Sequence, residues 1–130
     1  SKYWVSQSFN LHESLMIIPG LDLYYTTNTG IAFSLLAGVE GLSLVSFLAA
    51  TYFAYQLWFK PPLLLKWAYA LILAGAVGNG IDRFFNGYVV DFILIHYENY
   101  FWPAFNLADI YITIGIIVLI MTFFIRSEED

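Results

Sequence analysis

Long stretches without charged residues constrain this 130-residue chain more than any other feature of its sequence. Gly41 to Phe59 has no charged residue and is long enough to cross a bilayer, because a hydrocarbon core of about 30 Å needs about 20 helical residues. Only 12% of the chain is charged and 60% is hydrophobic, which is too much apolar surface for a small soluble domain to bury. We therefore expect an integral membrane protein.

The same criterion predicts three transmembrane helices in an antiparallel bundle, all within one membrane domain that covers residues 1–130. The expected fold class is all-α, with two extended runs outside the spans that are rich in β-branched and aromatic residues. The predicted spans are about 41–59, 63–83 and 101–125, and the extended runs are 21–27 and 88–95.

The positions of the basic residues indicate which side of the membrane each end of this bundle faces. Lys60 and Lys66 flank the connection between the first two spans, and Arg126 follows the third, so chain alternation places all three on one side. The positive-inside rule makes that side cytoplasmic. The outer segment 1–40 and the outer connection 84–100 are then expected on the opposite, extracytoplasmic side.

Seven polar residues meet at the outer side in this topology, although they come from four separate parts of the chain. Three share one helix face at the exit of the second span, and two share a face at the entrance of the third. For the three residues at the second span, an ion pair that anchors the helix end explains the pattern as well as a functional role does. The seven are Asn28, Asn79, Asp82, Arg83, Asp91, Asn106 and Asp109.

Two of these aspartates lie in apolar surroundings. Pro103 suits a first helical turn, so Asp109 is expected about 9 Å further along the axis, at or inside the edge of the hydrocarbon. An ionisable group there indicates function by default, the alternative being a carboxylate that the helix dipole favours near an N-terminus. Asp91 interrupts an apolar run, between Val89 and Ile93 on the same strand face, and needs a partner or a proton there.

Together, Asp91 and Asp109 predict a hydrolytic site. Two neighbouring carboxylates cannot both ionise easily, so the pair holds a single proton. The ionised member can draw a proton from water while the protonated member polarises a carbonyl, which hydrolyses an amide without a metal or cofactor. Signatures of other sites are missing: the chain has no cysteine, no His-Glu-x-x-His or Gly-x-Ser-x-Gly motif and only five Lys and Arg residues.

Two non-enzymatic functions stay open on these residues alone. Aspartates in membrane spans also serve proton and ion relays, so the chain could be an ion-handling membrane subunit. A stretch of small residues is expected to let a neighbouring helix approach closely, and could equally make the chain a structural subunit. Its members are Ala74, Gly75, Ala76, Gly78 and Gly80.

Three blocks of residues resemble a known family. In chain order they are Asn28-Thr29-Gly30-Ile31-Ala32-Phe33-Ser34, then Gly78-Asn79-Gly80-Ile81-Asp82-Arg83 with Gly87-Tyr88-Val89-Val90-Asp91-Phe92, and finally Phe105-Asn106-Leu107-Ala108-Asp109. The chain thereby resembles bacterial lipoprotein signal peptidase (signal peptidase II), an intramembrane aspartic protease, over nearly its whole length. Ser1-Lys2 is similar to the pair that ends the family's first span, so we expect that span to be absent from this chain.

The resemblance implies the identity of the site and of its substrate. It implies four transmembrane helices in the family, a small extracytoplasmic β-cradle, and a location in the bacterial inner membrane. The implied substrate is a prolipoprotein, cleaved just before a cysteine that carries diacylglycerol, and globomycin is the implied inhibitor. We expect a monomer in contact with membrane lipids, with no metal, cofactor or nucleic acid. The implied catalytic residues are Asp91 and Asp109, and the implied site-lining residues are Asn28, Gly30, Asn79, Asp82, Arg83 and Asn106.

Overall fold

The computed structural model describes residues 1–30 and 41–127, and these form two compact units that we treat separately. Among the described residues, the sheet unit consists of 1–30, 41–42 and 82–107, and the helical unit of 43–81 and 108–127. The second half of the first motif block, Ile31-Ala32-Phe33-Ser34, lies outside the described residues.

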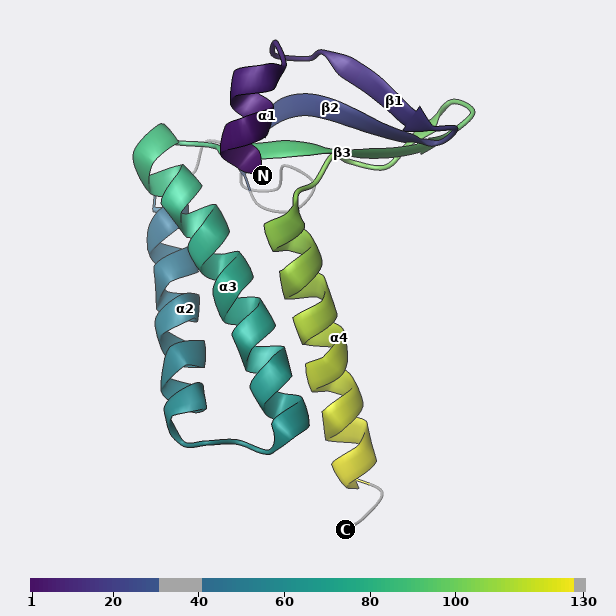
Figure 1. Ribbon diagram of the computed structural model, residues 1–130. Coiled ribbons are helices and arrows are strands. Elements are labelled where there is room, and N and C mark those ends of the chain that lie inside the picture. Colours follow the sequence, from purple (N-terminus) through teal and green to yellow (C-terminus); the bar gives the residue numbers. More distant parts are fainter. Residues whose placement is uncertain (31–40, 128–130) are drawn as a thin grey trace. The chain divides into compact units, whose positions relative to one another are not determined.

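Three helices supply the helical unit: α2 (Leu42–Trp58), α3 (Leu63–Asn86), whose last residues belong to the sheet unit, and α4 (Leu107–Ser127) (Figure 1). They confirm the three predicted helices. α3 and α4 are long and apolar enough to cross a membrane, whereas α2 is a shorter apolar helix of 17 residues. That α2 also crosses the membrane stays a prediction.

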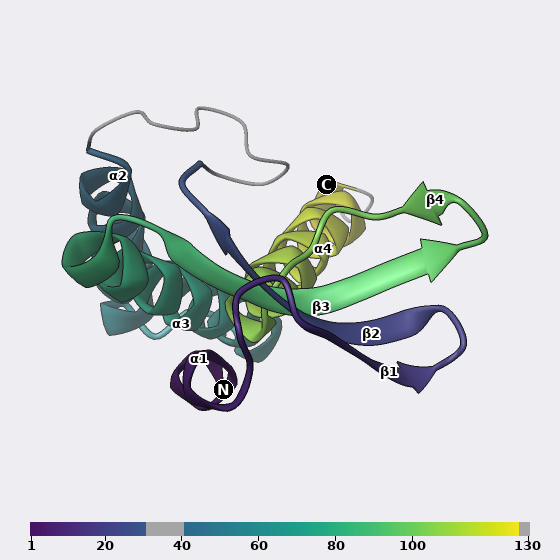
Figure 2. The same cartoon turned by 90° about the horizontal axis from the view of Figure 1, so that it is seen from above.

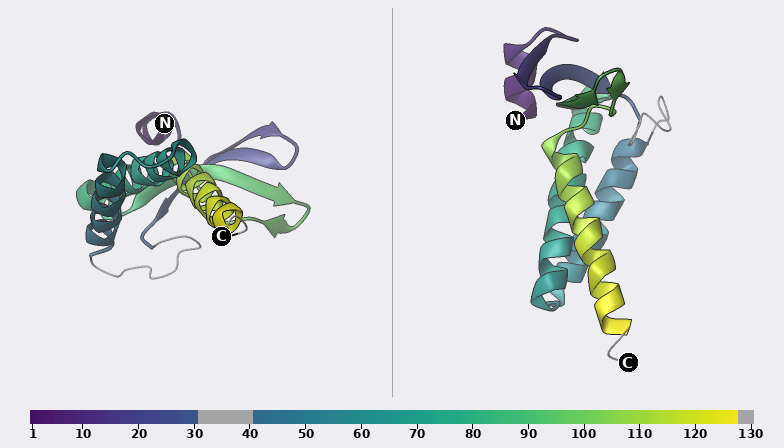
Figure 3. Two further views of the ribbon diagram at one scale, coloured as in Figure 1. Left: turned by 90° about the horizontal axis from the view of Figure 1, so that it is seen from below. Right: turned by 90° about the vertical axis from the view of Figure 1, so that its right-hand side faces the viewer.

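Glycines let α3 and α4 approach closely, as the small-residue stretch predicts. A Cβ atom at Gly75 would collide with the carbonyl oxygen of Ala108 and the side chain of Ile112. A Cβ atom at Gly115 would lie 2.6 Å from Cγ1 of Ile72. Because Gly75 meets the start of α4 and the earlier residue Ile72 meets the later residue Gly115, the two helices run antiparallel, side by side as Figure 3 shows.

A four-stranded antiparallel sheet forms most of the sheet unit, in the order β1-β2-β3-β4 (Figure 2). Its central strands confirm the two predicted extended runs, whereas the outer strands and a short N-terminal helix were not predicted. The protein therefore combines helices with a small sheet, as the β-cradle that the resemblance implies would require, and the all-α class is not confirmed. The elements are α1 (Lys2–Ser8), β1 (Ser14–Ile18), β2 (Leu21–Asn28), β3 (Val89–Tyr97) and β4 (Tyr100–Phe101).

An apolar core joins α1 to the sheet. Val5 of α1 is buried against Val90 and Phe92 of β3, and Leu23 and Tyr25 of β2 pack around them. Alternate residues of a strand point to opposite faces, so this core takes up one face of β3 and leaves Asp91 for the other.

The third predicted helix begins later than expected. Residues 101–106 continue along the sheet, because the amides of Trp102 and Phe105 donate to the carbonyl oxygens of Ile95 and Ile93 at 2.8 and 3.0 Å. These hydrogen bonds satisfy backbone groups that a helix would otherwise have to pair. Pro103 therefore precedes the helix, and Asp109 lies in the first turn of α4 instead of well inside it.

Candidate active site

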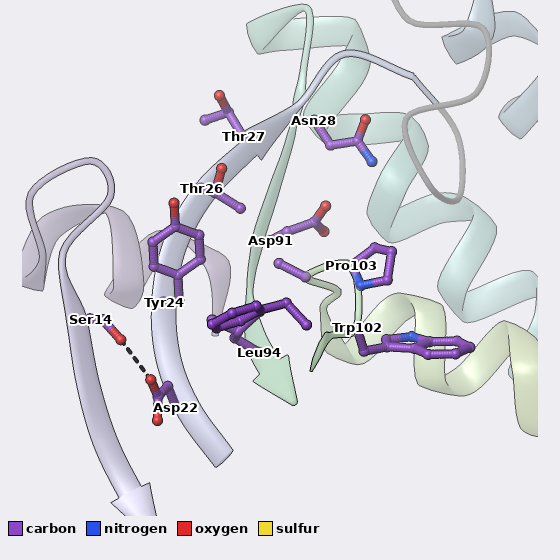
Figure 4. A pocket seen from close by; sticks show the side chains of 12 residues that line it. Ser14, Asp22, Tyr24, Thr26, Thr27, Asn28, Asp91, Leu94, Trp102 and Pro103 are labelled. Carbon is purple, nitrogen blue, oxygen red and sulfur yellow. Dashed lines mark hydrogen bonds between the residues drawn. The ribbon is translucent and has the colours of Figure 1, made fainter. Parts of the chain in front are cut away.

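A pocket of about 630 Å³ lies on the sheet unit and includes Asp91 (Figure 4). Asp91 and Asn28 lie towards one end, and Asp22, which accepts a hydrogen bond from Ser14 at 3.0 Å, lies towards the other. One wall is polar and comes largely from β2, while the other is largely apolar. The polar lining residues are Ser14, Asp22, Tyr24, Thr26, Thr27, Asn28 and Asp91, and the others are Leu94, Phe101, Trp102, Pro103 and Ala104.

A β-bulge explains how Asp91 and Leu94 can both line this pocket. Three positions apart on a regular strand, they would point to opposite faces. However, the amides of Phe92 and Ile93 both donate to the carbonyl oxygen of Phe105, at 2.9 and 2.8 Å. Two residues opposite one define a bulge, a device that re-aims side chains beside active sites.

Asp91 is buried and hydrogen-bonded. Its side chain is held by Asn106, whose Nδ2 donates to Oδ1 of Asp91 at 2.8 Å. The exposed fractions of the two residues are 3% for Asp91 and 0% for Asn106. This confirms that a carboxylate in these apolar surroundings has a partner.

Asp109 has an equivalent partner within the helical unit. Nδ2 of Asn79 on α3, which is 4% exposed, donates to Oδ1 of Asp109 at 2.9 Å. The N-terminus of α4 also favours a negative charge here. Because α3 and α4 are antiparallel, this bond lies at the end of the helical unit away from Lys60 and Lys66.

The remaining predicted residues form two bonded groups in the sheet unit. Asn28 accepts the Gly30 N–H at its Oδ1 (2.8 Å), and Nη2 of Arg83 donates to the Gly30 carbonyl oxygen, also at 2.8 Å. Asp82 pairs with Lys2, with 3.2 Å between Oδ2 and Nζ. The expected helix-end ion pair therefore exists, and it joins Asp82 to Lys2.

The structure thus brings the predicted residues together within each unit. Asp91 and Asp109 belong to different units, so their mutual approach stays a prediction. The sheet unit holds Asn28, Gly30, Asp82, Arg83, Asp91 and Asn106, and the helical unit holds Asn79 and Asp109.

Sequence reasoning missed the polar wall of the pocket and the role of Lys2. Asp22, Tyr24 and Thr26 recur at every second position of β2, a period that predicts one polar strand face. That signal was present in the sequence. Nothing local indicated that Lys2 pairs with a residue eighty positions away.

Removing the Asn106 amide tests the bond that holds Asp91. Asn106→Ala is expected to lower the free energy of unfolding by about 1.5–3 kcal/mol, because it leaves a buried carboxylate without this donor. Thermal unfolding in detergent, followed by tryptophan fluorescence, measures the change. Asn10→Ala, at an exposed asparagine that bonds Glu13, is the control. Equal stability of the two variants would contradict the prediction.

Comparison with known proteins confirms the resemblance of the three blocks. Residues 1–125 match the family described as Signal peptidase (SPase) II. The chain is 46% identical to a lipoprotein signal peptidase of Trichormus variabilis, covering 100% of this chain and 84% of that protein. It is 48% identical to one of Nostoc sp., covering 93% of this chain and 78% of that protein.

Solved structures agree with this relationship. One bacterial membrane enzyme matches with a TM-score of 0.90 and 30% identity, over 99% of this chain and 81% of the other. A second matches with a TM-score of 0.80 and 32% identity, over 94% and 81%. With a family match across almost its full length, the chain belongs to the signal peptidase II family and is a membrane peptidase.

Proposed function

We propose that this peptidase removes the signal peptide from diacylglyceryl-modified prolipoproteins, with Asp91 and Asp109 as its catalytic pair. The similar proteins of Trichormus variabilis and Nostoc sp. are named lipoprotein signal peptidases. One observation carries the catalytic assignment: each aspartate accepts a hydrogen bond from a buried asparagine, Asn106 or Asn79. Family membership favours this function over an ion-handling subunit.

Chain connectivity supports the pairing of the two aspartates. Asn106 is bonded to Asp91 and precedes Asp109 by only three residues. Three residues span at most about 11 Å between Cα atoms in any conformation. This tether limits how far apart Asp91 and Asp109 can lie, and we propose that their two carboxyl groups share a water molecule and a substrate amide.

The chemistry follows from one shared proton. The ionised carboxylate accepts a proton from water, whose oxygen attacks the scissile carbonyl carbon, while the protonated carboxyl donates to the carbonyl oxygen. Collapse of the tetrahedral intermediate breaks the C–N bond. The leaving amine takes the proton that came from water, and a hydroxyl of the intermediate returns a proton to the other carboxylate, so the pair again holds one proton. Asn106 and Asn79 each fix the orientation of one carboxyl group throughout.

The pocket beside Asp91 suits an extended peptide with a lipid on one residue. Polar side chains of β2 can orient the peptide backbone, and the apolar wall with Leu94 and Trp102 covers it. The diacylglyceryl chains would enter sideways from the bilayer between apolar helices. We propose that the sheet is the substrate cradle and that one chain suffices, since it supplies both aspartates.

The proposed location is the bacterial inner membrane, crossed by α2, α3 and α4, with the site on the extracytoplasmic side. Lys60 and Lys66 lie in or near the α2–α3 connection, and the Asn79–Asp109 bond lies at the other end of the helical unit. If the basic end faces the cytoplasm, as the positive-inside rule requires, Asp109 faces outward.

Cleavage of a purified diacylated prolipoprotein tests this function. In detergent or proteoliposomes, the protein is expected to convert the substrate to a faster-migrating product on a gel, and globomycin is expected to block the conversion. The same prolipoprotein without its lipid is the control and should stay intact. Folded enzyme that leaves the lipidated substrate uncleaved, or cleaves both forms equally, would contradict the proposal.

A further inference from the structure

We infer that Lys2 and Asp82 are positioning residues for Asp91, because their ion pair fixes the strand that carries it. The inference rests on the proposed catalytic role of Asp91. It adds Lys2 on α1 to the residues on which turnover depends, and it gives Asp82, near the end of α3, a role outside the pocket.

One carboxylate oxygen joins three elements of the sheet unit. Oδ2 of Asp82 accepts the backbone N–H of Val90 at 3.0 Å and lies 3.2 Å from Nζ of Lys2. Val90 immediately precedes Asp91 in β3. The peptide group that leads into Asp91 is therefore bonded directly to Asp82 and, through it, linked to α1.

This ion pair is largely shielded from solvent. The side chains of Lys2 and Asp82 are 16% and 15% exposed. The pKa of Tyr25 is raised, first by burial and then by Tyr88 and by the negative charge of Asp82. The charge of Asp82 therefore acts on a neighbouring side chain. Removing the Lys2 charge would leave a poorly hydrated carboxylate, which is far more disruptive than loss of an exposed pair.

α1 also contacts Val90 directly. Val5 packs against the side chain of Val90 on the face of β3 away from the pocket, while Asp82 holds its backbone. Neither Lys2 nor Val5 lines the pocket. We propose that they influence catalysis through the position of Asp91, and a shift of about 1 Å in a reacting group can cost about 100-fold in rate.

Kinetics of four variants test the inference. Lys2→Met is expected to lower kcat by about 10- to 100-fold while KM changes less than about twofold, because the pocket lining is intact. Asp82→Asn should behave similarly, since it keeps an acceptor for Val90 but loses the charge. The double variant should be no slower than the slower single variant, and Lys2→Arg should restore most of kcat.

Controls separate positioning from loss of folded protein. Rates are normalised to the amount of enzyme that binds globomycin, and Lys66→Met supplies the same charge change on α3 away from Asp82. Unchanged kcat in folded Lys2→Met, or losses that multiply in the double variant, would overturn the inference. If Lys2→Met does not fold, Lys2→Gln carries the same test. Full turnover by Asp91→Asn would instead refute the proposed function.

Discussion

Asp91→Asn and Asp109→Asn are each expected to reduce the rate of prolipoprotein cleavage by about 1,000-fold or more. General acid–base catalysis by one group typically contributes about 100- to 10,000-fold. Asparagine has nearly the same size as aspartate but can neither accept the proton of water nor donate one to the substrate carbonyl. Initial rates from the gel assay measure the loss. Because the two carboxyls act as a unit, the double variant should be no slower than either single variant.

Glu98→Gln is the matched control for this pair. Glu98 follows β3, the strand that carries Asp91, and lies outside the pocket, so the same loss of charge should leave the rate unchanged. Thermal unfolding must show that all variants remain folded. Substantial turnover by either folded aspartate variant would refute the catalytic pair, even if the family's substrate is still bound.

Gly75→Ala is expected to separate α3 from α4. The new methyl group would meet the backbone oxygen of Ala108, which cannot rotate away, as well as the Ile112 side chain. Overpacking typically costs about 1–3 kcal/mol, and a backbone collision should reach the upper end of that range. Activity should fall with stability, because the Asn79–Asp109 bond joins the same two helices one turn further along α3.

Gly78→Ala is the control on the same helix. A Cβ atom there would lie 3.4 Å from Cβ of Ala108, an ordinary contact. The variant should unfold at nearly the same temperature as the unaltered protein, whereas Gly75→Ala should unfold well below it, with tryptophan fluorescence in detergent as the measurement. Similar losses in both variants would show that helix propensity or solvation, and not the close approach at Gly75, sets stability.

The helices were predictable because they depend on local chemistry. Long apolar stretches with few charged residues predicted α2, α3 and α4 to within a few residues, except at the start of α4. There the error came from reading Pro103 as a first helical turn. Tertiary hydrogen bonds prevent the helix from starting there, because residues 101–106 bond to β3. No local sequence pattern links these residues to that strand.

The sequence predicted which residues belong to the candidate site, but not which contacts they make. Periodicity and apolar context singled out Asp91 and Asp109, and the structure supplies the asparagine that each one bonds. The bulge at Phe92 and Ile93 could not be foreseen, because it depends on where Phe105 pairs. The Lys2–Asp82 ion pair could not be predicted either, since an ion pair between distant residues produces no periodic pattern in the sequence.

The contacts of Asp109 and Gly115 make the first two turns of α4 intolerant of length changes. One residue inserted between them would turn every later position of α4 by about 100° about its axis, since a helix has 3.6 residues per turn. Gly115 would then turn away from Ile72 while Asp109 stayed with Asn79. Insertions and deletions among homologues should therefore fall in other connections, such as the one between α2 and α3, and spare the start of α4.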